Sequence, residues 1–196
     1  MKYIVFLGDG MADYPCEELN GKTPLELAKK PNMDYFAQHG VCGTAKTVPD
    51  GMKPGSDTAN LSVLGYNPRE FYSGRSPLEA LSIGVPMKDT DVALRCNIVT
   101  LSEEEDNYED RTIIDHSSGE ISTEECAVLL EAVKKELETD IFHFYVGTSY
   151  RHCLIWENGE VVDLVQPHDV LGQKIGDKLP ENEALRTMMK KSYDIL

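Results

Sequence analysis

Asp9 lies between two glycines, directly after the apolar run from Tyr3 to Leu7. A short apolar run closed by glycine is typical of a buried parallel strand, and ligands of α/β sheets bind at the loops that follow the carboxyl ends of such strands. Two interpretations of Asp9 stay open: a turn whose carboxylate accepts backbone hydrogen bonds, and a ligand of a hard divalent cation. The flanking glycines would leave room for an ion and its phosphoryl partner.

Ser56 follows Pro54-Gly55 and precedes a predicted helix from Thr58 to Leu64. Its hydroxyl would lie at a helix N-terminus, where free backbone N–H groups stabilise an anion. An ordinary N-cap serine has the same local sequence, and a nucleophilic serine would need a metal or a base to hold its alkoxide. Asp9 could supply such a metal if the two loops meet at one edge of the sheet.

The net charge of the chain limits the classes of partner that it can bind. Lys plus Arg number 19 and Asp plus Glu number 34, which gives a formal charge of -15. Such a field repels a phosphate backbone and an anionic membrane, so we expect neither nucleic acid nor a membrane as partner. A small anionic substrate remains compatible with this charge if the few basic residues gather in one pocket.

Arginine is the residue type best suited to such a pocket, because its planar fork fits carboxylate and phosphate alike. Arg95 alternates with Leu94 and Cys96 in an otherwise apolar segment, and Arg151-His152 begins another strand candidate. Taken singly, each of these residues is expected to serve a structural salt bridge. Their use in substrate binding is the alternative.

Residues 1–72 are predicted to form part of a parallel α/β sheet. Thr23 and Glu26 form a capping box that opens a helix, and a second short helix from Met33 to His39 stops at Gly40. At most three strands can be found here, too few for a parallel sheet covered on both faces. A partner or further sequence must therefore complete it.

Residues 73–196 are predicted to form a compact α+β domain. Ser122 and Glu125 form a second capping box at the start of an amphipathic helix, and a last helix runs from Asn182 to Tyr193. The turn Asn158-Gly159 predicts a hairpin. The strand candidates are Val92 to Leu101, Ile141 to Val146, Arg151 to Trp156 and Val161 to Val165.

Cysteine usage and the N-terminal segment predict a cytoplasmic location. The apolar run after Met1 is too short for a signal peptide or a membrane span. No two cysteines form a CxxC pair, so reduced thiols are expected rather than disulfides or a zinc site. The cysteines are Cys16, Cys42, Cys96, Cys126 and Cys153.

Taken together, several segments resemble the archaeal-type cofactor-independent phosphoglycerate mutases of the alkaline phosphatase superfamily. The most specific stretch runs from Pro54 to Tyr66, with the sequence PGSDTANLSVLGY. The other matches follow in order over nearly the whole chain: Gly8–Asp13, Gly21–Glu26, Pro31–Asp34, Gly74–Ala80, Leu94–Asn97, Tyr150–His152 and Pro167–Asp169.

The resemblance implies a glycolytic isomerase that interconverts 2-phosphoglycerate and 3-phosphoglycerate through a phosphoserine intermediate. The substrate is thus a small phosphorylated hydroxy acid. It implies two divalent metal ions (Mn, Mg, Zn or Co) and no 2,3-bisphosphoglycerate. Asp9 corresponds to a metal ligand, and Ser56 to the nucleophile that also touches a metal. The implied fold is a partial parallel sheet of the alkaline phosphatase type, followed by an inserted α+β domain.

The inserted domain closes over the substrate in this family. Arg95, Arg151 and His152 fall within it and correspond to substrate-binding positions. Arg75 and His168 lie in two further matching segments and are weaker candidates for the same role.

Members of the family are roughly twice as long, and their remaining metal ligands lie in a later half. The chain therefore resembles an N-terminal half, and we expect it to be inactive without the missing C-terminal half of the catalytic domain. Two alternatives stay open. One is a homoserine kinase-like or other metal-dependent phosphoryl-transfer enzyme of the same superfamily, and the other is a non-catalytic α+β binding module.

Overall fold

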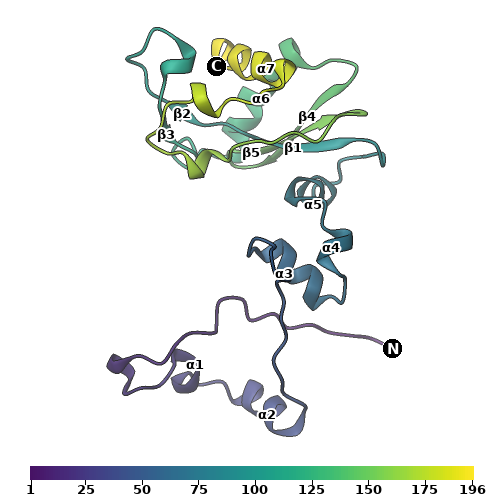
Figure 1. The fold of residues 1–196 in the computed structure, drawn as a ribbon, viewed down its shortest axis with the longest axis vertical. Coiled ribbons are helices and arrows are strands. Elements are labelled where there is room, and N and C mark those ends of the chain that lie inside the picture. The colour runs from purple at the N-terminus through teal and green to yellow at the C-terminus, as the bar shows by residue number, and fades with distance from the viewer. The chain divides into compact units, whose positions relative to one another are not determined.

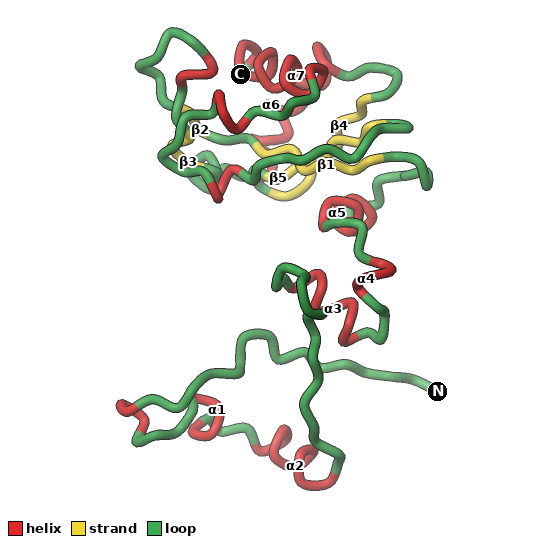
Figure 2. The backbone as a smooth tube through the Cα atoms, viewed as in Figure 1, coloured by secondary structure: helices red, strands yellow, loops and turns green.

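The computed structural model describes residues 1–196 as two units, Met1–Thr47 and Val48–Leu196 (Figure 1). The chain is α/β in content, with helices and two small antiparallel sheets (Figure 2). None of its helices combines the length and the apolar character that a membrane crossing requires. The two units are described in turn.

The first unit consists of short helices joined by extended segments. A 3-10 helix spans Glu17–Leu19, α1 spans Pro24–Leu27 and α2 spans Pro31–His39. The predicted capping box is present, with Glu26 Oε2 accepting from the Thr23 backbone N–H at 2.7 Å. Every residue of this unit is at least partly exposed, so local signals form these helices without a buried core.

The apolar run from Tyr3 to Leu7, predicted as a parallel strand, forms no strand in this structure. Tyr3 is 85% exposed and Phe6 is 90% exposed. A strand needs hydrogen-bond partners on a neighbouring strand, and the only ladder contact of this unit is an isolated bridge between Cys16 and Lys22. Both sheets of the chain are antiparallel, and a parallel sheet is not part of the described structure.

The second unit carries five α-helices, and the sequence predicts four of them: Thr58 to Leu64, Pro77 to Ile83, the helix after Ser122, and Asn182 to Tyr193. Ser122 accepts from the Glu125 N–H in a second capping box, and the Asn182 side chain caps the last helix. The helices are α3 Ser56–Val63, α4 Pro68–Phe71, α5 Arg75–Ser82, α6 Thr123–Leu137 and α7 Glu183–Ile195. Short 3-10 helices span Tyr108–Asp110, Pro167–Asp169 and Gly176–Lys178.

The main sheet has the strand order β1-β5-β4, all antiparallel. Its strands are β1 Val92–Asn97, β4 Phe142–Thr148 and β5 Arg151–Trp156. The predicted long strand from Val92 to Leu101 is interrupted, because Thr100–Leu101 (β2) pairs instead with Ile113–Asp115 (β3) in a second sheet.

The predicted hairpin at Asn158-Gly159 and the strand from Val161 to Val165 are not formed. Val161 is 92% exposed, and the segment has no ladder partner. The reason lies in the sheet order, since β5 is already paired on both sides and offers no free edge to a returning chain. The hairpin lies one connection earlier, between β4 and β5, where Ser149 has a φ of +53°.

Side chains alternate between the two faces of the main sheet, and each face packs against helices. Leu130 of α6 and Leu185 of α7 cover one face, together with Leu94, Val133, Phe142, Phe144 and Leu154. Ala80 of α5 covers the other face, together with Val85, Ala93, Cys153 and Ile155. A third cluster joins Tyr108, Ile113, Val170 and Ile175 beside the second sheet.

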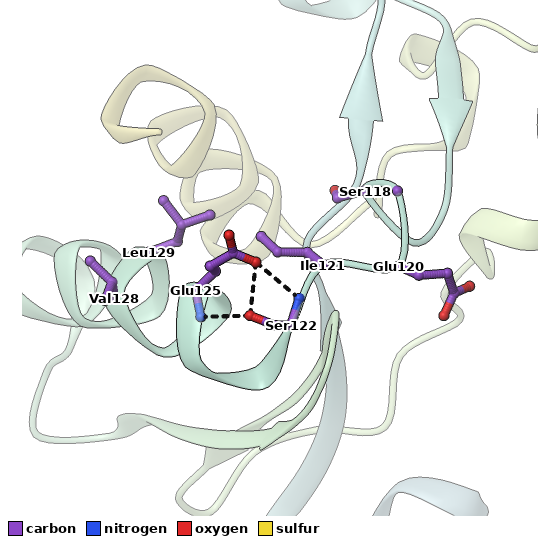
Figure 3. Close-up of a pocket in the computed structure, with 8 residues that line it drawn as sticks. Ser118, Glu120, Ile121, Ser122, Glu125, Val128 and Leu129 are labelled. Atoms are coloured by element: carbon purple, nitrogen blue, oxygen red, sulfur yellow. Dashed lines mark hydrogen bonds between the residues drawn. The ribbon is translucent and has the colours of Figure 1, made fainter.

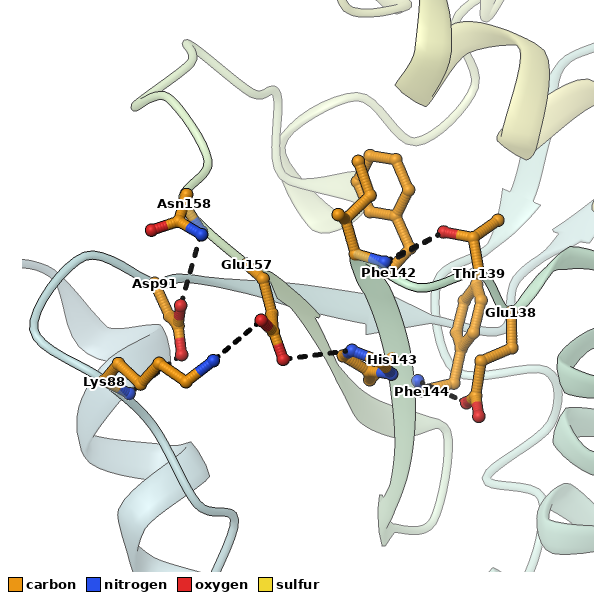
Figure 4. Close-up of polar contacts among 10 residues, drawn as sticks. Lys88, Asp91, Glu138, Thr139, Phe142, His143, Phe144, Glu157 and Asn158 are labelled. Carbon is orange, nitrogen blue, oxygen red and sulfur yellow. Dashed lines mark hydrogen bonds and ion pairs between the residues drawn. The ribbon is translucent and has the colours of Figure 1, made fainter.

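The outer edge of β4 is protected by side chains from the preceding turn. Thr139 Oγ1 accepts from the Phe142 N–H at 3.1 Å, and Glu138 Oε2 accepts from the Phe144 N–H at 3.2 Å (Figure 4). Unpaired edge donors invite pairing with other chains, so these contacts close that edge. Nearby, Glu157 accepts from Lys88 Nζ at 2.8 Å and ties the connection before β1 to the end of β5.

All five cysteines are free thiols. Burial raises the pKa of Cys96 to about 12 and that of Cys153 to about 11. Cys126, on α6, is fully buried, and burial raises its pKa as well. Cys42 is exposed and Cys16 is half-buried, and both belong to the first unit.

Candidate functional site

Ser56 is the first residue of α3, and Gly55 is the N-cap. The interpretation of Ser56 as an N-cap is therefore wrong for this structure. Its side chain is exposed, and its hydroxyl makes no hydrogen bond. The hydroxyl thus lies beside the free N–H groups of a helix start.

The residue after Ser56 connects α3 to the segment before α5. Asp57 Oδ2 accepts from Tyr72 Oη at 2.6 Å, and Asp57 Oδ1 accepts from the Thr58 N–H at 2.8 Å. Burial opposes ionisation of Asp57, but these two bonds and the charge of Arg75 together hold its pKa below the ordinary value. Burial and the Asp57 carboxylate raise the pKa of Tyr72 to about 12. Tyr72 is therefore a neutral donor to an ionised carboxylate.

Glu79 of α5 joins two arginines. Its Oε1 accepts from Arg75 Nε at 2.8 Å, and its Oε2 lies 2.9 Å from Arg95 Nε on β1. Glu79 thus joins Arg75 to Arg95 of the main sheet, and the charge of Arg75 also acts on Asp57 at the start of α3.

Arg95 and Arg151 lie on the same face of neighbouring strands. In the β1–β5 register Arg95 is opposite Cys153 and Asn97 is opposite Arg151, so all four side chains point to the face that carries α5. Both arginines line a pocket of about 180 Å³. Its walls also include Ser76, Glu79 and Ser82 of α5, Ile83 directly after it, and Gly147 and Thr148 of β4. The two arginines therefore lie on neighbouring strands and line one pocket.

His152 also borders this pocket, but it alternates to the opposite face of β5. It is 4% exposed, and its Nδ1 accepts from the Gly147 N–H at 3.2 Å, while its Nε2 is buried without a hydrogen bond. Burial lowers the pKa of His152, which favours the neutral imidazole. A Cβ at Gly147 would collide with the carbonyl oxygen of Arg151, so glycine is required where His152 is held.

His168 is connected to Arg151 through two rings. The Arg151 Cζ lies 5.3 Å from the centre of the Tyr150 ring, and His116 contacts that ring edge-on at a centroid distance of 5.7 Å. His116 in turn lies 6.2 Å from His168. Sequence reasoning gave neither Tyr150 nor His116 a role, because the ring contacts with His168 join three segments that are far apart in the sequence.

Asp9 lies in an exposed turn of the first unit, with Gly10 at a φ of +71°. Ser56 and the arginines belong to the second unit, so Asp9 is described apart from them. No group of three or more His, Cys, Asp or Glu side chains in the described chain could hold a metal ion.

A second, wider hollow lies at the start of α6 (Figure 3). Ser122 and Glu125 line it, and their polar atoms are already paired in the capping box, with Ser122 Oγ donating to Glu125 Oε2 at 2.8 Å. Val128, on its apolar side, is 71% exposed. The hollow therefore offers a ligand no convergent set of free polar groups.

Comparisons with known proteins point to one family. A family model described as 2,3-bisphosphoglycerate-independent phosphoglycerate mutase matches residues 37–196. A Geobacter sulfurreducens protein named probable 2,3-bisphosphoglycerate-independent phosphoglycerate mutase is 49% identical over 97% of this chain and 47% of its own length. A Methanosarcina barkeri protein named 2,3-bisphosphoglycerate-independent phosphoglycerate mutase is 48% identical over 100% of this chain and 49% of its own.

The fold has a solved counterpart. The structure of the PH0037 protein from Pyrococcus horikoshii matches 96% of this chain and 42% of its own length, with 27% identity and a TM-score of 0.67. The chain spans about half the length of the curated relatives it matches. Because the family model matches most of the chain, the chain belongs to the 2,3-bisphosphoglycerate-independent phosphoglycerate mutase family.

Proposed function

We propose that this chain is part of an enzyme that interconverts 2-phosphoglycerate and 3-phosphoglycerate through a phosphorylated Ser56. The observation that carries the proposal is the position of the Ser56 hydroxyl. It is exposed and unpaired at the start of α3, and Asp57, Tyr72 and Arg75 link that helix to the pocket of Arg95 and Arg151. A nucleophile and an anion-binding pocket are the two parts that such a transfer needs.

Ser56 Oγ would take the phosphoryl group from one hydroxyl oxygen of glycerate and return it to the neighbouring hydroxyl oxygen. In the first half the serine proton passes to the glycerate oxygen that loses the phosphoryl group, and in the second half the proton of the neighbouring hydroxyl passes to the serine oxygen, so the reaction is balanced without water. The backbone N–H groups at the start of α3 would bind the phosphoryl oxygens.

The family resemblance assigns Asp9 and Ser56 as metal ligands, and a carboxylate and a hydroxyl are hard oxygen donors of the kind that Mn²⁺ or Mg²⁺ prefers. Bound divalent cations would make the serine oxygen a better nucleophile and offset the charge of the phosphoryl group. The other ligands would come from the remaining half of the catalytic domain.

Arg95 and Arg151 would bind the carboxylate and phosphate of the substrate, with Arg75 and His168 at the periphery. His152 would hold the end of β5 that carries Arg151, through its bond from the Gly147 N–H. In the whole enzyme, residues 73–196 would form the domain that closes over phosphoglycerate. Residues 1–72 would join the metal-binding domain, with Tyr3–Leu7 as a strand of its parallel sheet.

The test uses the enzyme reconstituted with its remaining half. Incubation with phosphoglycerate and Mn²⁺ should add one phosphoryl group to Ser56, detected by intact-mass analysis, and Ser56→Ala should abolish both the adduct and turnover. Ser62→Ala, on the same helix, is the matched control and should retain both. A Ser56→Ala enzyme with full mutase activity would overturn the proposal.

A further inference from the structure

The pocket that would bind the substrate anion already contains an anion. Glu79 is the only acidic side chain that lines it, whereas Arg95 and Arg151 are its basic ones. The Glu79 carboxylate reaches Arg75 with one oxygen and Arg95 with the other. Cys153 lines the same pocket.

The contact with Arg95 is incomplete. Arg95 Nε is buried and makes no hydrogen bond of good geometry, although Glu79 Oε2 is 2.9 Å away. A buried donor without a well-aligned acceptor is costly, so Arg95 would gain from an acceptor that meets it better. The carboxylate or phosphate oxygens of a ligand are such acceptors, because charged planar pairs with arginine are among the strongest hydrogen bonds.

We propose that Glu79 is an exchangeable counter-anion of this pocket, which neutralises Arg75 and Arg95 until the substrate anion displaces it from Arg95. The inference rests on the proposed function, since it names what the entering phosphoglycerate must replace. Glu79 then sets the affinity of the pocket, because a ligand must bring enough negative charge to compete with a carboxylate that is already in place. A salt bridge that only supported the fold would have no such effect on ligand binding.

The experiment titrates 3-phosphoglycerate into the 196-residue chain by calorimetry near neutral pH. Glu79→Gln keeps the side-chain volume and removes the charge, and it should bind the ligand about tenfold more tightly than the unmodified chain. Glu131→Gln is the matched control, since Glu131 is exposed on α6 and the substitution changes the net charge equally. It should leave the affinity unchanged. Glu79→Ala is a second charge-removing variant in case the glutamine variant fails to fold.

Two results would overturn the inference. One is an affinity of both Glu79 variants equal to or weaker than that of the unmodified chain. The other is an equal gain in affinity for Glu131→Gln, which would show that the net charge of the chain explains the effect. Arg95→Gln separates this inference from the proposed function. If that variant loses binding while the Glu79 variants gain none, the anion pocket stands and only the role of Glu79 fails. If it binds as before, the pocket itself is wrong.

Discussion

The two units of the chain contain similar local signals and differ in what those signals build. Each has a capping box, Thr23 with Glu26 in the first and Ser122 with Glu125 in the second. Only the second unit buries side chains, and it does so on both faces of its sheet. The difference shows that capping and turn chemistry can form a helix locally, whereas a stable unit needs apolar area removed from water.

Separating the units should give the largest effect. We expect residues 48–196 to unfold in one cooperative thermal transition, because their core is internal to that segment. Residues 1–47 alone should show no transition, since they bury no side chain completely. Circular dichroism of the two peptides measures both. A cooperative transition of residues 1–47 would contradict the view that only the second unit has a stable core.

Truncating an apolar side chain should matter in only one unit. Leu130→Ala removes a side chain that is 2% exposed in the core, and it should lower the free energy of unfolding by about 2–5 kcal/mol. Phe36→Ala is the counterpart in the first unit. Phe36 is 70% exposed, so we expect a change within about 0.5 kcal/mol. Urea titration of both variants gives the values, and similar losses would show that the first unit shares the core's stability.

The pH dependence of stability should come from the second unit. Burial lowers the folded-state pKa of His152 from 6.5, so between the two pKa values the unfolded chain binds a proton that the folded chain does not. The contribution of His152 to the free energy of unfolding is therefore complete above pH 6.5. It declines as the pH falls below that value, by at most about 1.4 kcal/mol per pH unit.

His152→Gln should flatten this decline, measured as unfolding midpoints across the pH range. The matched control is His39→Gln in the first unit, which should leave the decline unchanged because His39 is exposed and outside the cooperative core. An unchanged slope in His152→Gln would contradict the assignment.

Removing one cap from each unit should give the smallest effect. Ser122→Ala should reduce the free energy of unfolding by about 1 kcal/mol, because the start of α6 loses its acceptor. Thr23→Ala loses the equivalent bond and should leave global unfolding unchanged, since α1 is not coupled to a core. Denaturant titrations of the two variants test this, and equal losses would again contradict the comparison.

Sequence reasoning succeeded where the signal is local. Both capping boxes, the helix after Asn182 and three segments of the main sheet lie where the pattern predicts them. It failed for Tyr3–Leu7 and Val161–Val165, because an apolar run shows that a strand is favourable but not whether a free edge is available. The order of β5 between β1 and β4 decides that question for Val161–Val165, and for Tyr3–Leu7 it is the lack of a neighbouring strand in the first unit. Both depend on residues far away in the sequence.

The candidate site follows the same rule. Ser56 and the arginines stand out by type and neighbourhood, and the antiparallel register then places Arg95 and Arg151 on one face. Glu79 gave no such signal, because the helix predicted from Pro77 to Ile83 leaves Arg75 outside it, and the pair of Arg75 and Glu79 at a spacing of four residues is one that an ordinary helix surface shows. Its second contact, with Arg95, depends on how α5 packs on β1, and no local pattern encodes that packing.

The distribution of the cysteines turns the contrast between the units into a difference of chemical reactivity. Thiol alkylation requires the thiolate, and the raised pKa values of Cys96 and Cys153 leave almost none of it in the folded second unit. Cys42 of the first unit is exposed, so we expect it to react without unfolding of the chain. The modification rate of the buried thiols therefore reports how often the core opens. The modification rate of Cys42 gives the reference for a thiol that needs no opening.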